Sequence, residues 1–205
     1  KIMTDAISGS NDSINEIQKR YPALSEKEAR EIYALVTAGA KNPSNTASLV
    51  VTAPPSFSIH AKPTKVVVDA MITNAQRSIW ITGYSLSDYF TDLVDCIIKK
   101  SQEGVFVKFF VNDIDNQKAF ERLCRYRGRF LKIYNYPKQK DTMSALHAKV
   151  ISVDQKETLI TSANLSYHGQ EGNIELGAQI ESRETAKQVE DVFTQLIFSK
   201  VFVEV

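Results

Sequence analysis

The sequence is poor in the features that would assign it to several common classes of protein. Its 205 residues include only two cysteines and three histidines. Cys96 and Cys124 have no CxxC spacing, so neither a disulfide framework nor a zinc finger fits. No run of about 18 apolar residues could cross a membrane, and residues 1–10 lack the apolar core of a signal peptide. We therefore expect buried, reduced thiols in a cytoplasmic protein with no membrane span.

The chain also has no excess of either charge. Its formal net charge is +1, and 43% of its residues are apolar while 24% are charged. Such a chain does not attract anions over its whole surface, so any site for a polyanion must be local. The length fits one globular domain with a short extension, and it suffices to bury a sizeable core.

The first quarter of the chain reads as a helical appendage. In "SEKEAREIYALVTAG", Ser25 and Glu28 have the spacing of a capping box, and a weaker helical pattern, "NDSINEIQKRY", precedes them. The following stretch, "KNPSNTASLVVTAPPS", is rich in Pro, Ser and Asn and surrounds a short apolar piece. We expect a helical N-terminal extension and linker over residues 1–55, and the main domain over residues 56–205.

From residue 57 onward, helix-like and strand-like segments alternate. We expect helices over residues 63–76, 88–104, 116–126 and 183–200, and strands over residues 78–84, 105–113, 130–136, 146–154, 158–164 and 173–180. Alternation of this kind favours an α/β fold with a mixed, largely parallel sheet sandwiched between helices.

Polar residues occur in pairs within the apolar stretch "LHAKVISVDQKETLITSAN". On a strand, residues two apart point to the same face of the sheet. His147 and Lys149 therefore project together from one strand, and Ser162 and Asn164 project together from the next. If these strands are neighbours, the four polar groups meet on one face.

This combination of residues suits chemistry on a phosphate diester. Lysine and asparagine can donate hydrogen bonds to the charge that grows on the phosphate oxygens, and histidine can attack phosphorus. Glu175, at the start of a third strand, is the candidate carboxylate that would fix the tautomer of the histidine. The sequence has neither a carboxylate cluster typical of Mg²⁺ nor a histidine set typical of zinc, so we expect no metal and no cofactor.

At these residues the sequence resembles the phospholipase D superfamily. The segment "HAKVISVD" matches the pattern H-x-K-x-x-x-x-D, "TSAN" lies where the family usually has Gly-Ser-x-Asn, and "NIEL" lies where it often has a glutamate. Asp154 ends the first pattern. Because it lies an odd number of positions after His147 along the chain, it would point to the opposite face of a regular strand. The resemblance implies that it holds the local structure. Thr161 departs from the pattern, since it replaces the usual glycine and could crowd a phosphate.

The resemblance implies a role for each remaining residue of the pattern. His147 would be the nucleophile that forms a phosphohistidine. Lys149 and Asn164 would bind the non-bridging phosphate oxygens, with support from Ser162, and Glu175 would orient the histidine.

The family mechanism needs two such motifs, because a second histidine protonates the leaving group. This chain has one motif, and neither His60 nor His168 completes another. The resemblance therefore implies a homodimer, in which one His147 attacks and the His147 of the second copy acts as the general acid.

Two further features could contribute to substrate binding. Tyr84 follows a buried strand at its carboxyl end, where ligands bind in open α/β sheets. Basic and aromatic residues alternate shortly before the motif; they are Arg122, Arg125, Tyr126, Arg127, Arg129, Phe130, Lys132, Tyr134, Tyr136, Lys138 and Lys140. This basic cluster is either an ordinary solvated surface or a rim that guides a phosphate backbone into the site.

Three functions remain open. The first is a metal-independent nuclease that acts on DNA or RNA. The second is a phospholipid phosphodiesterase, although no amphipathic interfacial segment is evident. The third is a catalytically weak nucleic-acid-binding subunit of a larger complex. The helical N-terminal piece, the "SLVVTAPPS" connector and the single motif resemble the phospholipase-D-like component of the bacterial phage-defence system DISARM, which implies helicase and methyltransferase partners.

Overall fold

The computed structural model describes residues 2–40, 46–54, 60–83, 91–112, 119–137 and 144–205, without the side chains of residues 2–10, 38–40 and 119. The chain divides into two compact units, Lys1–Ser44 and Asn45–Val205.

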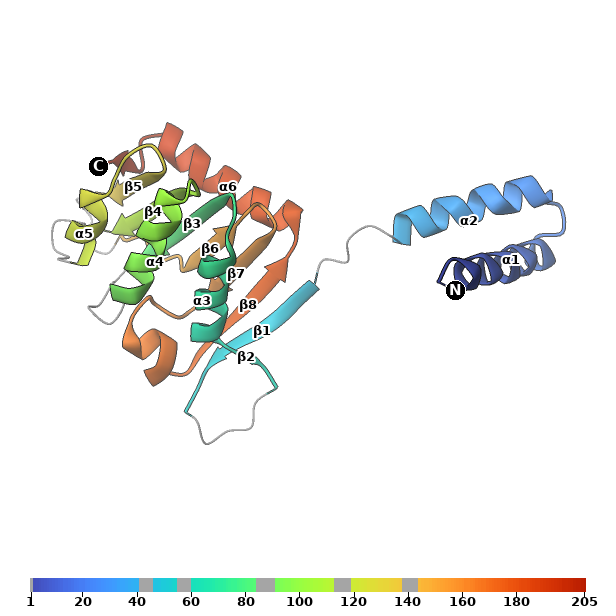
Figure 1. Ribbon diagram of the computed structural model, residues 1–205, viewed down its shortest axis with the longest axis horizontal. Coiled ribbons are helices and arrows are strands. Elements are labelled where there is room, and N and C mark those ends of the chain that lie inside the picture. The colour runs from blue at the N-terminus through green and yellow to red at the C-terminus, as the bar shows by residue number, and fades with distance from the viewer. Residues whose placement is uncertain (1, 41–45, 55–59, 84–90, 113–118, 138–143) are drawn as a thin grey trace. The chain divides into compact units, whose positions relative to one another are not determined.

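The first unit contains two helices, α1 (Ile2–Arg20) and α2 (Glu26–Ala40) (Figure 1). The start of α2 has the predicted capping box. The Glu28 carboxylate accepts hydrogen bonds from the Ser25 backbone N–H at 2.8 Å and from the Ser25 hydroxyl at 2.6 Å, and the Glu28 N–H donates to the Ser25 Oγ at 3.3 Å. The side-chain hydrogen bond from Ser25 lowers the pKa of Glu28. The helical N-terminal extension is therefore confirmed, and α1 begins earlier than the sequence pattern indicated.

The second unit forms, within the described residues, one nine-stranded sheet. In chain order its strands are β1 (Thr46–Thr52), β2 (Lys62–Pro63), β3 (Ser78–Gly83), β4 (Phe106–Asn112), β5 (Leu131–Tyr136), β6 (Val150–Val153), β7 (Glu157–Thr161), β8 (Glu175–Glu181) and β9 (Val203–Glu204). Across the sheet the order is β2-β1-β8-β7-β6-β3-β4-β5-β9. The helices are α3 (Thr64–Asn74), α4 (Thr91–Gln102), α5 (Ala119–Arg125) and α6 (Arg183–Phe198), with a short π-helix, η3 (His168–Gly172), before β8.

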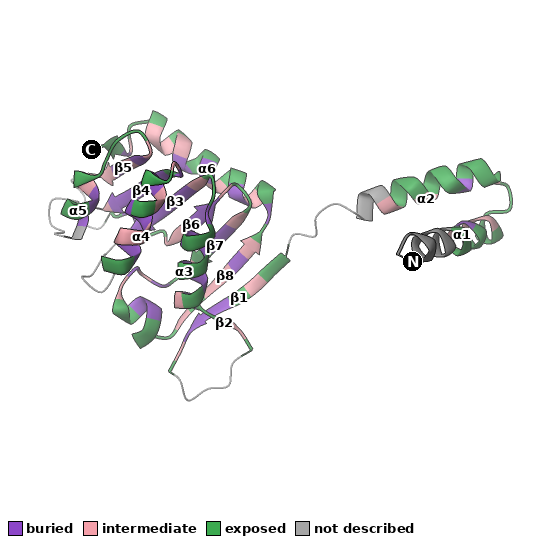
Figure 2. Ribbon diagram, in the orientation of Figure 1, coloured by how far each residue is buried: buried purple, intermediate pink, exposed green. Residues whose placement is uncertain are grey.

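Apolar residues cover both faces of the sheet because side chains alternate along each strand. Ile79 and Ile81 of β3 pack into one core with residues of α3, α4 and α5. Trp80, between them, packs into a second core with Phe110 of β4 and Phe193 of α6. Figure 1 accordingly shows α3 and α4 on one face and α6 on the other, and Figure 2 shows buried residues concentrated on the central strands.

The fold class is confirmed, but the sheet is less parallel than we predicted. Three pairings are parallel, β1–β2, β3–β4 and β4–β5, whereas β1–β8, β3–β6, β5–β9, β6–β7 and β7–β8 are antiparallel. A parallel pair needs a long crossover connection. Helical segments supply it between β3, β4 and β5, but only three residues separate β6 from β7, which allows only an antiparallel pairing.

Two predicted boundaries also differ from the structure. The stretch Thr46–Thr52, which we assigned to the extension and linker, is a strand of the main sheet that pairs with β8 along its whole length. Val50, in the second half of this strand, is fully buried. The apolar residues of this stretch therefore decide its structure, despite the Pro and Ser around them. The strand expected from residue 146 begins only at Val150, which leaves His147 and Lys149 just outside it.

Candidate active site at one end of the sheet

His147 and Lys149 lie at the end of the sheet where β3 finishes and the antiparallel β6 begins, which we call the His147 end. Two polar side chains fix the segment there. The Thr82 hydroxyl donates to the Ala148 carbonyl at 2.7 Å and accepts from the Val150 N–H at 2.8 Å. Asn112, the last residue of β4, accepts from the Leu146 N–H at 2.9 Å. These side chains replace regular strand pairing, so they explain why β6 starts after the HxK residues.

Sequence reasoning missed Thr82 and Asn112. Both lie at the carboxyl ends of buried parallel strands, where ligands bind in open α/β sheets. Their polar side chains at these positions were the available signal.

The His147 and Lys149 side chains are in direct contact. The Lys149 Nζ lies 3.0 Å from each ring nitrogen of His147 and donates to the His147 carbonyl at 2.8 Å. Partial burial lowers the pKa of Lys149, and the negative charge of Glu175 opposes that shift. The predicted nucleophile, cation and carboxylate therefore occupy one neighbourhood, and His147 is exposed to solvent there.

Ser162 and Glu175 meet across the pairing of β7 with β8. The Ser162 hydroxyl donates to Glu175 Oε2 and accepts from the Leu176 N–H at 3.2 Å. Asn173 donates to Glu175 Oε1 at 3.0 Å. Because Ser162 and Asn173 hold both oxygens of Glu175, its carboxylate has a fixed direction beside Lys149. Its orienting effect on His147 remains a proposal.

Asn164 follows β7 and is held by the π-helix. The Gln170 side chain donates to the Asn164 carbonyl at 3.2 Å. A Cβ at Gly169 would lie 2.3 Å from the Asn164 carbonyl oxygen, so only glycine permits this approach. The buried Asn164 Oδ1 has no hydrogen-bond partner among the described residues.

Thr161, in the position of the usual glycine, is accommodated by a glycine on the neighbouring strand. Thr161 pairs with Gly177, and a Cβ at Gly177 would lie 2.7 Å from the Thr161 Cβ. The Thr161 hydroxyl donates to the Leu176 carbonyl at 3.3 Å and accepts from the Ala163 N–H at 3.1 Å. The threonine therefore packs against the sheet, and its hydroxyl is used by the backbone.

Asp154 lies at the opposite end of β6, which we call the Asp154 end. Its Oδ1 accepts from the backbone N–H groups of Arg77 at 2.7 Å and Ser78 at 2.9 Å, and its Oδ2 accepts from that of Gln76 at 3.0 Å. Its backbone has a φ of 57°, in the left-handed region. The carboxylate therefore anchors the start of β3, in agreement with a structural role rather than with direct participation in catalysis.

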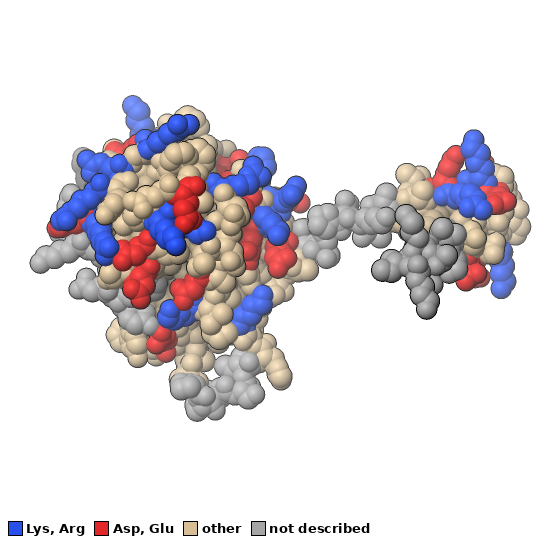
Figure 3. Space-filling model, viewed as in Figure 1, with Lys and Arg blue, Asp and Glu red and all other residues tan. Residues whose placement is uncertain are grey.

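Part of the basic cluster lies away from the motif. Phe130 precedes β5, and its carbonyl accepts from the Val107 N–H at 2.7 Å, so Arg129 and Phe130 lie at the Asp154 end. Lys132 pairs with Glu204 at 2.5 Å. The prediction that this part of the cluster forms a rim at the catalytic residues is therefore wrong. Basic and acidic residues are interspersed on the face in Figure 3. Tyr84, Lys138 and Lys140 lie outside the described residues.

Two other features are absent from the described part of the chain. It holds no group of three or more His, Cys, Asp or Glu side chains that could bind a metal ion. None of its helices is both long and apolar enough to cross a membrane.

Solved structures share this architecture. Nuc from Salmonella typhimurium, a phospholipase D family member, superposes with a TM-score of 0.60 at 18% identity, covering 78% of this chain and 99% of that one. NucT from Helicobacter pylori has a TM-score of 0.60 at 20% identity, covering 76% and 98%. The phosphatidylserine synthase of Haemophilus influenzae has a TM-score of 0.56 at 15% identity, covering 95% and 53%. At these identities the likeness concerns the fold.

Sequence comparison is more specific. The DISARM protein DrmC of Bacillus paralicheniformis is 33% identical over 157 residues, which are 75% of this chain and 64% of that relative. The family model described as "Cardiolipin synthase, PLD-like domain" matches residues 68–197, well over half of the chain and the whole of the HxKxxxxD motif. The chain therefore belongs to the phospholipase D-like family.

Proposed function

We propose that this protein is a metal-independent phosphodiesterase that cleaves nucleic acid, with DNA as its substrate, through a phosphohistidine on His147. The supporting observation is the contact between His147 and the Lys149 ammonium in an exposed position beside Glu175. A histidine attacks through the lone pair of a ring nitrogen, and the exposed position of His147 gives a phosphate ester access to its ring.

Each step of the reaction conserves atoms and charge. A ring nitrogen of His147 attacks phosphorus, and the bond from phosphorus to the leaving oxygen breaks. A second imidazolium gives its proton to that oxygen. Water then attacks phosphorus, and the bond from phosphorus to the His147 nitrogen breaks. The water loses a proton to the same second imidazole, which restores both histidines. Lys149 and Asn164 bind the non-bridging oxygens, whose charge increases in the transition state.

We propose that the second imidazole is His147 of another copy, because the sequence holds only one HxKxxxxD motif. An apolar surface adjoins the catalytic residues and suits this association. Leu49 and Ile160 both face Ala178 across the sheet, and Leu176 lies two residues from Ala178 on the same face. Their exposed fractions are 54% for Leu49, 43% for Ile160 and 57% for Leu176. Burying such residues favours a stable interface between copies.

The similarity to the DISARM protein DrmC supports a role in phage defence, beside the helicase and methyltransferase that the resemblance implies. Because this chain spans 64% of that relative, membership in such a complex is part of the proposal.

The proposal is tested with single-stranded DNA, double-stranded DNA, RNA and phosphatidylcholine vesicles, each incubated with the protein in EDTA. We expect nucleic acid to be cleaved, His147→Ala to abolish cleavage, and His60→Ala, at an exposed histidine outside the motif, to leave it unchanged. Cleavage that requires a divalent metal contradicts the proposal. Turnover of phosphatidylcholine alone indicates a lipid enzyme. Nucleic-acid binding without turnover, unaffected by His147→Ala, indicates the non-catalytic subunit.

A further inference from the structure

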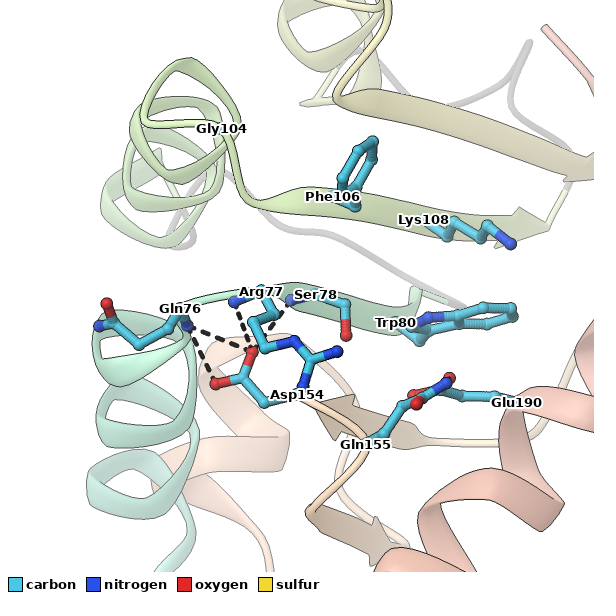
Figure 4. A pocket seen from close by; sticks show the side chains of 10 residues that line it. All are labelled: Gln76, Arg77, Ser78, Trp80, Gly104, Phe106, Lys108, Asp154, Gln155 and Glu190. Carbon is cyan, nitrogen blue, oxygen red and sulfur yellow. Dashed lines mark hydrogen bonds between the residues drawn. The ribbon is translucent and has the colours of Figure 1, made fainter.

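The Asp154 end of the sheet holds a cavity of about 600 Å³ that the proposed chemistry does not use (Figure 4). It lies on the face that α6 covers. Trp80 of β3 and Lys108 of β4 line it, together with Phe106, the first residue of β4, and Arg77, which directly precedes β3. Glu190 of α6 also lines it. A cavity of this size fits a ligand of about the size of a nucleotide.

The Phe106 ring offers a flat apolar surface at this cavity. It is 51% exposed although it begins a strand whose following residues are mostly buried. One side of the ring is supported by Phe130, with ring centroids 4.8 Å apart. A supported aromatic ring that remains half exposed is a suitable platform for stacking a planar group.

Arg77 and Lys108 line the same cavity as Phe106, and Arg129 lies beside the supporting Phe130 ring. The Lys108 Nζ lies 3.9 Å above the Trp80 ring, and the Arg129 guanidinium lies 5.2 Å from the Phe130 ring. Arg77 is exposed, and the structure records no ion pair for its guanidinium within the described residues. Arg77 and Arg129 can therefore bind anions, whereas Lys108 interacts with the nearby Glu190 carboxylate.

The two carboxylates at the cavity, Asp154 and Glu190, are bound by other groups of the protein. Asp154 is held by the backbone N–H groups of residues 76–78. Glu190 is only 4% exposed and accepts hydrogen bonds from Gln155 at 2.8 Å and Ser152 at 3.3 Å. Both carboxylates are thus held by groups of the protein, while Arg77 and Arg129 are exposed to solvent.

The combination of an exposed aromatic platform with flanking cations matches a nucleotide unit, which has a flat base and a phosphate. An acidic peptide would satisfy the cations but would leave the Phe106 ring without a partner. We propose that this cavity and its rim bind single-stranded nucleic acid, with a base stacked on Phe106 and adjacent phosphates bound by Arg77 and Arg129. This binding site is separate from the proposed catalytic residues, at the other end of the sheet, and does not depend on their activity.

The chain contains a single tryptophan, and Trp80 lines this cavity. Its fluorescence therefore reports directly on what enters. We would titrate the full chain carrying His147→Ala with a short oligothymidylate and follow the emission of Trp80. We expect a saturable change, and an affinity that falls about 5- to 100-fold in Phe106→Ala, the loss typical of one stacked base. Phe198→Ala, at a ring that is 82% exposed at the end of α6, is the control and should bind normally.

Arg77→Gln should weaken binding of every sequence and reduce the dependence of log affinity on log salt by about one unit. Lys187→Gln, at a lysine on α6 that pairs with Asp191, should leave that slope unchanged. Equal affinity of Phe106→Ala and the parent, or oligothymidylate binding without any change in Trp80 emission, would overturn the proposal. Thymidine monophosphate binding as tightly as the oligonucleotide, or polyglutamate causing the same change, would overturn it in favour of a free nucleotide or an acidic peptide.

These results are distinguishable from failure of the proposed catalysis. Cleavage is measured with the His147 variants, whereas the titration already uses a chain that lacks His147. Either proposal can therefore stand if the other fails.

Discussion

The two ends of β6 hold the two parts of one sequence motif, and they differ in what their polar groups bind. At the His147 end, the imidazole is exposed, the Lys149 ammonium lies against it, and Asn164 Oδ1 has no partner among the described residues. At the Asp154 end, the carboxylate accepts hydrogen bonds from three successive backbone N–H groups. A solvent-exposed imidazole with a cation against it is suited to ligand binding, while a carboxylate that holds backbone N–H groups contributes to stability.

The comparison predicts its largest effect at the His147 end. His147→Ala should lower the rate of phosphodiester cleavage by roughly 10³-fold or more, because it removes the nucleophile. Its free energy of unfolding should change by less than about 0.5 kcal/mol, since the side chain is exposed. Initial rates and urea denaturation of the same preparation give both values. A loss of about 1–3 kcal/mol, the range typical of a residue whose hydrogen bonds are lost, would instead make His147 a structural residue.

At the Asp154 end, substitutions should change the free energy of unfolding and leave the rate of cleavage unchanged. Asp154→Ala should lower the free energy of unfolding by about 1–3 kcal/mol, because three backbone N–H groups lose their acceptor and alanine is less suited to a φ of 57°. Asp154→Asn is the matched control, since asparagine keeps one acceptor oxygen and tolerates this conformation, and it should lose less. Urea denaturation measures both. If Asp154→Asn retained full stability but lost cleavage, Asp154 would belong to the catalytic group.

The pairing of Thr161 with Gly177 can be tested by a double-mutant cycle. Gly177→Ala should lower the free energy of unfolding by about 1–3 kcal/mol, because its Cβ would overlap Thr161. Thr161→Gly should relieve part of that loss, because the new Cβ would still lie 2.8 Å from the Ile160 carbonyl. Thr161→Gly alone should change turnover by less than about tenfold, since the Thr161 hydroxyl is bound to the backbone. Strictly additive effects on stability would show that the two residues are not coupled.

The smallest expected effect is a dependence of phosphate affinity on pH. Burial lowers the pKa of Lys149, so this ammonium loses its proton at a lower pH than an ordinary lysine. Phosphate affinity should therefore fall as the pH rises toward 10, and it should remain level in Lys149→Arg, whose guanidinium stays charged. Binding of a non-cleaved phosphorothioate oligonucleotide to His147→Ala chains, with and without Lys149→Arg, measures the effect. Parallel pH profiles of the two chains would show that Lys149 does not supply this charge.

The sequence predicts which candidate residues come together better than it predicts how they are held. The spacing of two residues placed His147 with Lys149. Strand alternation singled out Ser162, and the need for a carboxylate singled out Glu175; these two side chains do meet across two strands. Thr82 and Asn112 were not found, because their hydrogen bonds to the motif join residues that lie 34 to 68 positions apart.

The same limitation applies to the fold. Helix and strand periods predicted the α/β architecture. They could not assign β1 to the sheet, because its partner β8 lies more than a hundred residues later in the chain. They could not show that Gly177 makes room for Thr161, since this compensation depends on the register between two strands. Hydrophobic patterns report local structure, and register and pairing are decided by tertiary contacts.

The most direct test of the shared site is the activity of a heterodimer that joins one wild-type copy to one copy with His147→Ala, isolated with two different affinity tags. If both imidazoles act on each phosphate, we expect the heterodimer to cleave DNA no faster than the dimer of two His147→Ala copies. Half of the wild-type activity in the heterodimer would contradict the account, because each copy would then work with its own histidine alone.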